Sequence, residues 1–317
     1  MSEPISAMSK QLLNAIGAKA KAFFKTMWQD FAHFAKTKWL YFVSSLIYFI
    51  LTCYIWGLPA GLLLSAGFYL ISLLVVFSPL GEILSRVLEH VRKIETKREM
   101  EYLLPLFQEV YLQAKEQNPE LGRIDICVID RMVVNACALG KHTIAVTKGA
   151  IETFDADELK ALIAHEIAHI LNGDTLAKLY ALIGGGFFTV FVVVSRVFIF
   201  IAEWIEMILS KSKFSFAWII ITLTKLLFDL IVFAISFIMQ IVISIYSRGS
   251  EYRADRYAYE LGHGEKLIEA LYLMEKMKLG DNSTVIQKMT ANHPRITARI
   301  KRLEILLDQE SAMQTAP

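Results

Sequence analysis

Apolar residues are concentrated in two long blocks of the chain, and the first runs almost unbroken from Trp39 to Leu80. A block of this length is about twice what one membrane-spanning helix needs. The uncharged segment Gly57–Gly61 lies near its middle and favours a tight turn, because it contains two glycines and Pro59. The pattern therefore predicts a transmembrane hairpin with helices at 39–56 and 60–80.

The second apolar block covers residues 179–246 and is divided by the polar stretch 203–215. It predicts a second hairpin with helices at 179–202 and 216–246, which gives four transmembrane helices in all. Because each hairpin returns to the side from which it started, the polar parts of the chain lie together on one side of the membrane. These parts are residues 1–38, 81–178 and 247–317.

Charges inside the second block are expected to find partners. Arg196 and Asp229 lie at the same depth when they are counted from the two ends of the block. Charged residues within a bilayer usually pair. We therefore expect a buried pair between these two residues, although Lys225 competes because it lies one helical turn from Asp229.

The N-terminal arm, residues 1–38, is rich in lysine. It carries six lysines against two acidic residues, Glu3 and Asp30, and the short hairpin loops show no comparable basic excess. By the positive-inside rule, the arm and the other polar parts are cytoplasmic. Apolar residues recur in the arm at mostly three- and four-residue steps, which predicts an amphipathic helix on the membrane surface. A partner-binding helix is the alternative.

Composition agrees with a membrane protein and excludes some other classes. Hydrophobic residues make up 55% of the 317, which is above the usual share in soluble domains, so the lipid bilayer is an expected partner. The formal net charge is only +2 and no basic block is present, so nucleic acid is not an expected partner. The scattered Cys53, Cys127 and Cys137 provide neither a disulfide framework nor a cysteine zinc site.

The polar part 81–178 is predicted to place helices around a small sheet. Residues 80–117 are charged and are expected to form one helical segment. Asp155 and Glu158 have the spacing of a capping box, which opens a helix that residues 172–174 are expected to end. Three β-like runs precede this helix: 124–129, 133–139 and 142–147.

The polar part 247–317 predicts further helices. The first begins near Ser247 and ends near Gly262, and the last begins at Pro294. The overall fold class is therefore α+β and predominantly helical, with a small β-sheet beside the helix that follows Asp155. Four apolar residues of the last helix are expected to point inward: Ile296, Ile300, Leu303 and Leu307.

The sequence His-Glu-Ile-Ala-His at residues 165–169 carries the candidate chemistry. On a helix, His165 and His169 share one face, where both imidazoles can bind one metal ion. Glu166 lies about a third of a turn away and can act as general base on a water that the metal activates. This is the arrangement of zinc peptidases, so we expect one Zn²⁺ per chain.

A zinc peptidase site needs a third protein ligand. Glu251 and Asp255 are four residues apart on a predicted helix and share one of its faces. Glu251 can therefore bind the metal while Asp255 accepts a hydrogen bond from a ligand histidine. The alternative is a solvated helix face on which both carboxylates pair with Arg248 and Arg256, and the spacing alone is compatible with either.

Together these motifs resemble the HtpX-type membrane zinc metalloproteases and, more distantly, the CAAX prenyl proteases. The order of the motifs and the four expected spans agree with this family over residues 39–305. The resemblance implies a gluzincin-type zinc protease domain in which Glu251 is the third metal ligand. The matching segments are Asn135-Ala136, Val146–Gly149, His165–Asp174, Ser247–Asp255 and His293–Arg299.

The resemblance also implies roles for residues outside the metal ligands. Asn135 and Ala136, on a β-like segment, are expected to hold the backbone of an extended substrate. His293 and Arg299 are expected to stabilise the oxyanion of the tetrahedral intermediate. A strand-end asparagine, a capping histidine and a salt-bridged arginine are the alternatives. Asp174, at the end of the motif helix, is a further candidate to support a ligand.

These observations predict a zinc metalloendopeptidase in a bacterial inner membrane, with its active site facing the cytoplasm. Its expected substrates are membrane proteins or peptides, and the resemblance implies quality control of misfolded or damaged membrane proteins under stress. A narrow-specificity processing protease of the CAAX type is one alternative. A non-catalytic membrane scaffold or chaperone is the other, although intact ligands and an intact base argue against it.

Overall fold

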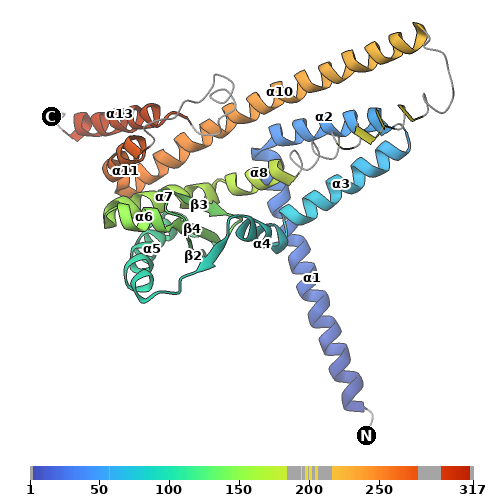
Figure 1. Cartoon of the computed structure of the whole chain (residues 1–317). Coiled ribbons are helices and arrows are strands. Elements are labelled where there is room, and N and C mark those ends of the chain that lie inside the picture. Colours follow the sequence, from blue (N-terminus) through green and yellow to red (C-terminus); the bar gives the residue numbers. More distant parts are fainter. Residues whose placement is uncertain are drawn as a thin grey trace.

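The computed structural model describes residues 3–56, 58–183, 216–277 and 294–314, with a few single positions between 194 and 205. Over these residues the molecule is mostly helical and contains one small mixed sheet (Figure 1). The sheet and the helices around it form one end of the molecule, and the long helix α10 (Phe216–Ala258) extends away from them beside α2 (Trp39–Trp56). The predicted α+β, predominantly helical class is confirmed.

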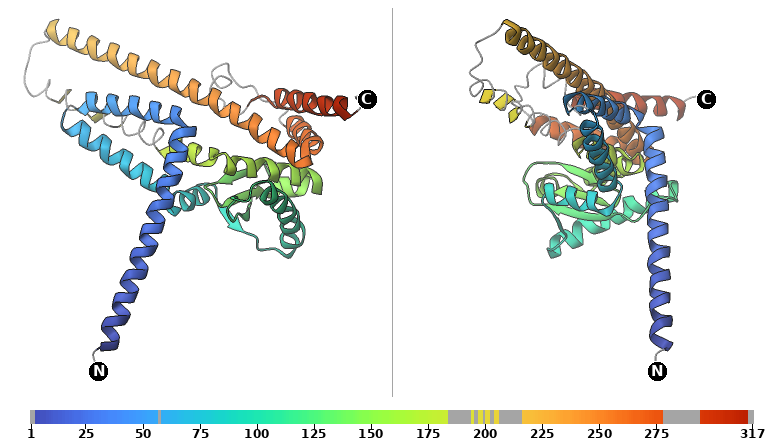
Figure 2. Two further views of the ribbon diagram at one scale, coloured as in Figure 1. Left: turned by 180° about the vertical axis from the view of Figure 1, so that it is seen from behind. Right: turned by 90° about the vertical axis from the view of Figure 1, so that its right-hand side faces the viewer.

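The N-terminal arm is a single helix, α1 (Glu3–Thr37), which projects away from the rest of the molecule in all the views (Figures 1 and 2). Its C-terminal turns contact the body, where Phe31 and Phe34 pack against Phe42 and Phe77. The helical prediction for the arm is therefore confirmed, and its proposed place on a membrane surface stays a prediction.

The first apolar block folds as the helix pair α2 (Trp39–Trp56) and α3 (Ala60–Val76), which pack against each other. The second helix is shorter than the predicted 60–80, because Ser78 caps a new helix, α4 (Pro79–Leu88). Proline is favoured at such a first helical position because it lacks the N–H that would have no partner there. The expected single helix is thus divided in two.

Only part of the four-span prediction falls on described residues. Among these residues no single helix is long and apolar enough to cross a membrane, whereas α3 and α4 meet that test together across a bend of 81°. Most of the predicted span 179–202 lies outside the described residues, as does Arg196 of the expected pair with Asp229. The number of spans and this pair stay predictions.

The sheet has strand order β1-β2-β4-β3, where β1 is Val91–Lys93, with β2 and β4 parallel and the other neighbours antiparallel. The strands β2 (Asp125–Ile129), β3 (Ala136–Leu139) and β4 (Thr143–Thr147) confirm the three predicted β-like runs. β3 lies at one edge of the sheet, with Ala136 opposite Val146 and Leu139 opposite Thr143. This edge faces the helix that carries the histidine motif.

The prediction of one helix over 80–117 is wrong. After α4 the chain forms strand β1 (Val91–Lys93), and only then α5 (Lys97–Gln117). His90 has a positive φ of 55°, and Thr96 with Glu99 forms a capping box that starts α5. The backbone conformation of His90 and this capping box interrupt residues 80–117, whose charge pattern is that of one continuous helix.

The motif helix α7 (Ala156–Leu171) follows the short α6 (Lys148–Thr153). Asp155 and Glu158 form the predicted capping box at its start. Its Leu159, Ile163 and Ile167 are fully buried in the main core, between the sheet and the surrounding helices. As predicted, α7 ends at 172–174, where Gly173 has a φ of 65° and α8 (Asp174–Ala181) begins.

The C-terminal part begins with α10 (Phe216–Ala258), a helix of 43 residues that continues through Ser247 without a break. The predicted fourth span and the predicted helix from Ser247 are therefore parts of one helix. A π-helical turn (Tyr259–His263), with Gly262 at a φ of 88°, leads to α11 (Gly264–Met277). The last helix is α13 (Ile296–Gln314), which begins two residues after the predicted start at Pro294 and buries Ile300 and Leu303 as predicted, whereas Ile296 and Leu307 are only partly buried.

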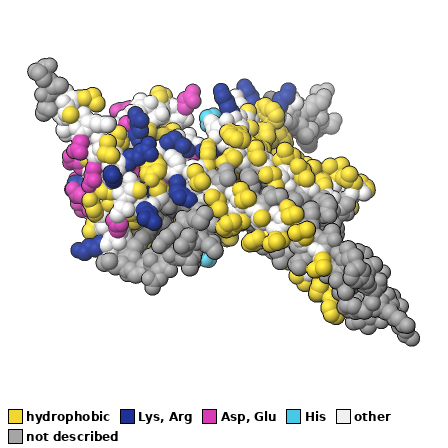
Figure 3. Space-filling view, turned by 90° about the horizontal axis from the view of Figure 1, so that it is seen from above, with side chains coloured by type: hydrophobic (Ala, Val, Ile, Leu, Met, Phe, Trp, Pro, Cys, Tyr) yellow, Lys and Arg dark blue, Asp and Glu magenta, His cyan; other side chains and the backbone are white. Residues whose placement is uncertain are grey.

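One end of the molecule exposes an unusually apolar surface. Figure 3 shows charged side chains over the end that contains the sheet and apolar side chains over the opposite end. Large exposed apolar patches mark surfaces that contact other proteins or lipid. The exposed apolar residues of α2, α3 and α10 include Leu46, Ile50, Leu63, Leu70, Ile71, Leu227, Leu230, Phe233 and Ile238.

Candidate metal centre

Helix α7 places the two motif histidines on its buried face, one turn apart. His165 is 3% exposed and His169 is 2% exposed, and their Nε2 atoms lie 3.2 Å from each other. Glu166, between them in the sequence, is 7% exposed. Burial of two imidazoles and a carboxylate on one short stretch is costly unless each has a partner, so their surroundings define what this site can bind.

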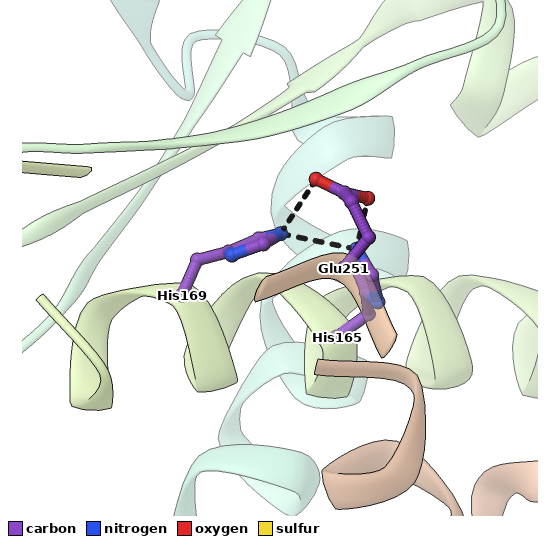
Figure 4. Close-up of side chains that lie close together, drawn as sticks. All are labelled: His165, His169 and Glu251. Carbon is purple, nitrogen blue, oxygen red and sulfur yellow. Dashed lines mark hydrogen bonds and ion pairs between the residues drawn. The ribbon is translucent and has the colours of Figure 1, made fainter. Parts of the chain in front are cut away.

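Helix α10 brings a third group to the histidines from far along the chain. Glu251 is 1% exposed, and its carboxylate oxygens lie 3.5 Å from His165 Nε2 and 3.4 Å from His169 Nε2. The three side chains point toward one another, two from α7 and one from α10 (Figure 4). They could hold one metal ion, since one ligand atom from each lies within 4.8 Å of the others.

The hydrogen bonds of the histidines show that this is a set of electron-pair donors. The Nδ1 atoms of His165 and His169 lie 3.0 Å from Asp255 and Asp174, respectively. A carboxylate can only accept, so each Nδ1 donates its hydrogen, which leaves each Nε2 as the ring atom that can bind a metal once it carries no proton. Two imidazole nitrogens and one carboxylate match the donors that zinc uses in peptidases.

Asp255 is itself held by a buried arginine. The Arg299 guanidinium makes two hydrogen bonds to the Asp255 carboxylate, one of them 2.8 Å long, and its Nη1 lies 3.5 Å from Glu251. Burial and Arg299 both act to lower the pKa of His165, but hydrogen bonds to Asp255 and Glu251 outweigh them and raise it to about 9. Without a metal, this imidazole therefore holds a proton where the metal would lie.

Asp174 has a second partner as well. Its Oδ2 accepts the hydrogen bond from His169, and its Oδ1 forms an ion pair with the buried Lys38. Burial by itself would raise the pKa of Asp174, but His169 and Lys38 lower it below its usual value. Asp174 is therefore an anion that fixes the ring of His169. Sequence reasoning did not single out Lys38.

A cleft of about 590 Å³ runs between the edge strand β3 and the metal centre. The backbone N–H of Ala138 on β3 donates to Glu166 Oε2 at 2.8 Å, so this part of the edge faces the histidines and not β4. Asn135 and Ala136 line the same cleft. Apolar side chains, among them Leu162, Leu271 and Met274, line the cleft as well.

The structure brings together most of the residues that the sequence singled out. Arg299 lies behind His165, where it binds Asp255, while its side chain also lines the cleft. This placement matches the salt-bridged alternative, and a direct role on an oxyanion stays a prediction. His293 lies outside the described residues. The solvated-face alternative for Glu251 and Asp255 is wrong, because both are buried beside the histidines.

Comparisons with known proteins match the part of the chain that carries these residues. The profile of Peptidase family M48 matches residues 98–306. A Protease HtpX homolog from Bacillus subtilis is 31% identical over 188 residues, which are 54% of this chain and 59% of that protein. Protease HtpX from Cellvibrio japonicus is 27% identical over 69% of this chain and 74% of its own length. These matches confirm the resemblance to HtpX-type proteases.

The matched regions do not extend over the whole of the relatives. The chain spans less than two thirds of the Bacillus subtilis protein and of a Bacillus licheniformis homolog, 59% and 63% of their lengths. The crystal structure of S. mikatae Ste24p aligns with 95% of this chain and 66% of its own chain, at 18% identity and a TM-score of 0.49. The family profile matches well over half of the residues, and on this basis the chain belongs to Peptidase family M48.

Proposed function

We infer that this chain is a membrane zinc endopeptidase that hydrolyses peptide bonds of membrane proteins at the cytoplasmic face. One observation carries this proposal: His165, His169 and Glu251 converge beside Glu166 at the open edge of a β-strand. A metal-ligand set, a general base and a strand edge that can align a peptide are the parts that peptide hydrolysis requires. They belong to one cleft here.

The fit of the donors favours zinc. His165, His169 and Glu251 would hold it, and the hydrogen bonds that the two imidazoles donate to Asp255 and Asp174 keep each ring in the orientation that binding needs. Bound zinc supplies a Lewis acid that polarises the scissile carbonyl and raises the acidity of water.

Glu166 is placed to move the proton. Its carboxylate lies in the cleft next to His165, and its Oε2 accepts from the Ala138 N–H at 2.8 Å. As general base it takes a proton from the attacking water, and it then returns that proton to the nitrogen of the departing amine. The hydrogen bond from the strand holds the carboxylate at the position where the peptide must pass.

In this proposal the edge of β3 binds the substrate backbone. Ala136 and Ala138 alternate with the residues that bond β4, so their main-chain groups face the cleft; the Ala138 N–H is bound to Glu166, and the main-chain groups of Ala136 with the Ala138 C=O remain for a peptide. An extended peptide added to this edge would run past Glu166 and the histidines. Asn135 lies at the start of the strand, where its main chain bonds Thr147. The proposed substrate is therefore an unfolded or extended segment.

Membrane proteins are the proposed substrate class. The exposed apolar surface of α2, α3 and α10 is continuous with the helix that supplies Glu251, and the relatives named Protease HtpX support a membrane location. A bacterial inner membrane, a cytoplasmic active site and the removal of damaged membrane proteins are parts of this proposal. Processing of a prenylated partner is the second candidate.

The test uses the full-length chain in detergent. We expect one zinc per chain, and we expect Glu166→Gln to keep that zinc while cleavage of an unfolded membrane protein falls by about 10²–10⁴-fold, since the general base is lost. Glu152→Gln, an exposed glutamate on α6, is the matched control and should leave cleavage unchanged.

Three results would count against this proposal. Wild-type turnover by folded Glu166→Gln protein contradicts the assigned base, and a wild-type protein without zinc contradicts the metal site. Zinc binding without cleavage of any substrate favours the alternative of a non-catalytic membrane scaffold or chaperone. A cleavage rate that depends on a prenyl group in a model peptide favours the narrow processing protease over quality control.

A further inference from the structure

Lys38 lies at the single non-helical residue between α1 and α2, and its side chain is buried. It is 2% exposed, next to the buried aromatic residues Phe34 and Tyr41, and its Nζ lies 5.4 Å from the centre of the Tyr246 ring. Lysine is among the residues that are almost never fully buried unless they are paired. A buried ammonium in such a place therefore calls for a specific partner.

That partner is Asp174, 136 positions further along the chain. The two oxygens of this carboxylate are divided between two groups: Oδ1 binds Lys38, and Oδ2 binds Nδ1 of the ligand His169 at 3.0 Å. Arg253 is the other cation near Oδ1, but it is 3.8 Å away and its side chain is 48% exposed. Lys38 is therefore the cation that fixes the orientation of the Asp174 carboxylate.

The junction that carries Lys38 is firmly docked. The main-chain oxygen of Thr37 accepts a hydrogen bond from the Tyr246 hydroxyl at 2.6 Å. The ring of Phe34 lies 5.4 Å from that of Tyr180 on α8, the helix that begins at Asp174. Lys38 thus approaches Asp174 from a fixed position and not as a mobile surface side chain.

We propose that Lys38 is a positioning residue of the metal centre, which orients His169 for zinc through Asp174. The cation holds Oδ1, so Oδ2 stays directed at Nδ1 and the imidazole presents its Nε2 to the metal. Lys38 lies outside the matched region 98–306, so the junction of α1 and α2 contributes to a site whose ligands come from the protease domain. This inference rests on the zinc site proposed above.

The measurement is the zinc affinity of the full-length protein, by competition with a chelator. Removal of a group that supports a ligand typically lowers metal affinity by about 10–100-fold. We expect Lys38→Met to weaken zinc binding by about tenfold and Lys38→Arg to retain most of the affinity. The visible spectrum of the cobalt-loaded protein, which reports ligand geometry, should change in Lys38→Met.

Lys141→Met is the matched control, because it removes another ion pair that ties α1 to the body. Lys141 binds Asp30 of α1 and lies in the turn between β3 and β4. If Lys38 acted only by docking α1, both variants would change zinc affinity alike. The proposal requires that Lys141→Met leave the affinity and the cobalt spectrum unchanged.

A double-mutant cycle tests the path through Asp174. In an Asp174→Asn background, Lys38→Met should weaken zinc binding less than about twofold further, because the carboxylate on which it acts is gone. A full tenfold loss in that background overturns the proposal. In the double variant the Asp174 carboxylate has been removed together with Lys38, so no buried carboxylate is left without a cation. Asp174→Asn and the double variant can therefore be compared even if Lys38→Met alone does not fold.

The outcomes separate this inference from the proposed function. If the wild-type protein binds no zinc, the proposed function itself fails. If the wild type binds zinc and folded Lys38→Met binds it equally tightly, the metal site stands and only the role of Lys38 is overturned.

Discussion

The two ligand histidines of α7 are supported by the same chemistry from different parts of the molecule. One is held by Asp255 and Arg299, and the other by Asp174 and Lys38. In each case a buried carboxylate accepts from Nδ1 of a ligand and is itself bound by a buried cation. The first support lies within the region matched by the M48 profile, whereas the second takes its cation from the N-terminal helices.

These two carboxylate–cation pairs, Asp255 with Arg299 (the arginine support) and Asp174 with Lys38 (the lysine support), differ more in their surroundings than in their chemistry. Arg299 precedes Ile300 and Leu303, which belong to the main core together with the buried face of α7. Lys38 lies beside Phe34 and Tyr41, which belong to a separate aromatic cluster where α1, α2, α3 and α8 meet. One ligand therefore depends on the core of the protease domain, and the other depends on how the N-terminal helices dock.

The largest expected effect concerns the stability of the arginine support. Arg299→Met leaves Asp255 buried without its cation, and breaking a buried pair in this way costs about 3–5 kcal/mol. Lys38→Met should cost less, because Arg253 remains near Asp174. Unfolding of the metal-free protein in denaturant measures both. Arg295→Met, at an exposed position, is the control. Equal losses of unfolding free energy in Arg299→Met and Lys38→Met would show that the two supports contribute equally to stability.

A smaller effect is expected on metal binding when the carboxylates are changed. Asp255→Asn and Asp174→Asn should each lower zinc affinity by about 10–100-fold, because an amide is a weaker acceptor for the imidazole N–H than a carboxylate. Chelator competition at constant pH measures the two values, and their ratio ranks the supports. Unchanged affinity in both variants would show that neither carboxylate orients a ligand.

The last prediction concerns the pH dependence of zinc binding at the arginine-supported histidine. The pKa of His165 is raised to about 9 in the metal-free site, because Asp255 and Glu251 outweigh burial and Arg299. Zinc must displace this proton, so its affinity should rise by about tenfold per pH unit up to pH 9 and then level off. A titration of zinc affinity from pH 6 to 10 measures this, and a curve that is flat below pH 9 would contradict the assignment.

The same shift acts in the opposite direction on the metal-free fold. A histidine whose pKa is raised by folding stabilises the protein fully below its unfolded pKa, and that contribution is lost as the pH rises through the folded value. Metal-free protein should therefore lose this part of its stability between about pH 6.5 and 9. Zinc-loaded protein should not, since the metal replaces the proton.

The sequence by itself determined the features that a single element carries. The spacing of His165 and His169 places them on one helical face, and the Asp155 capping box marks where that helix begins. The strand runs, the glycine that ends α7 and the inward apolar positions of α13 follow from local periodicity and backbone preference in the same way. Glu251 stayed open at that level, because its spacing to Asp255 fits a solvated face as well as a metal site.

Only the tertiary structure decided which groups meet at the metal centre. Lys38 and Asp174 are far apart in the sequence and belong to no shared motif, and Arg299 faces Asp255 only because α13 packs on α10. The pairing of β1 with β2 was likewise set by the tertiary structure, whereas the breaks before α4 and α5 carry local signals in Ser78 and in the Thr96 capping box. The physical reason is that local preferences act over one helical turn or strand pair, whereas the burial of a charge is stabilised only by whatever partner the whole fold brings within reach.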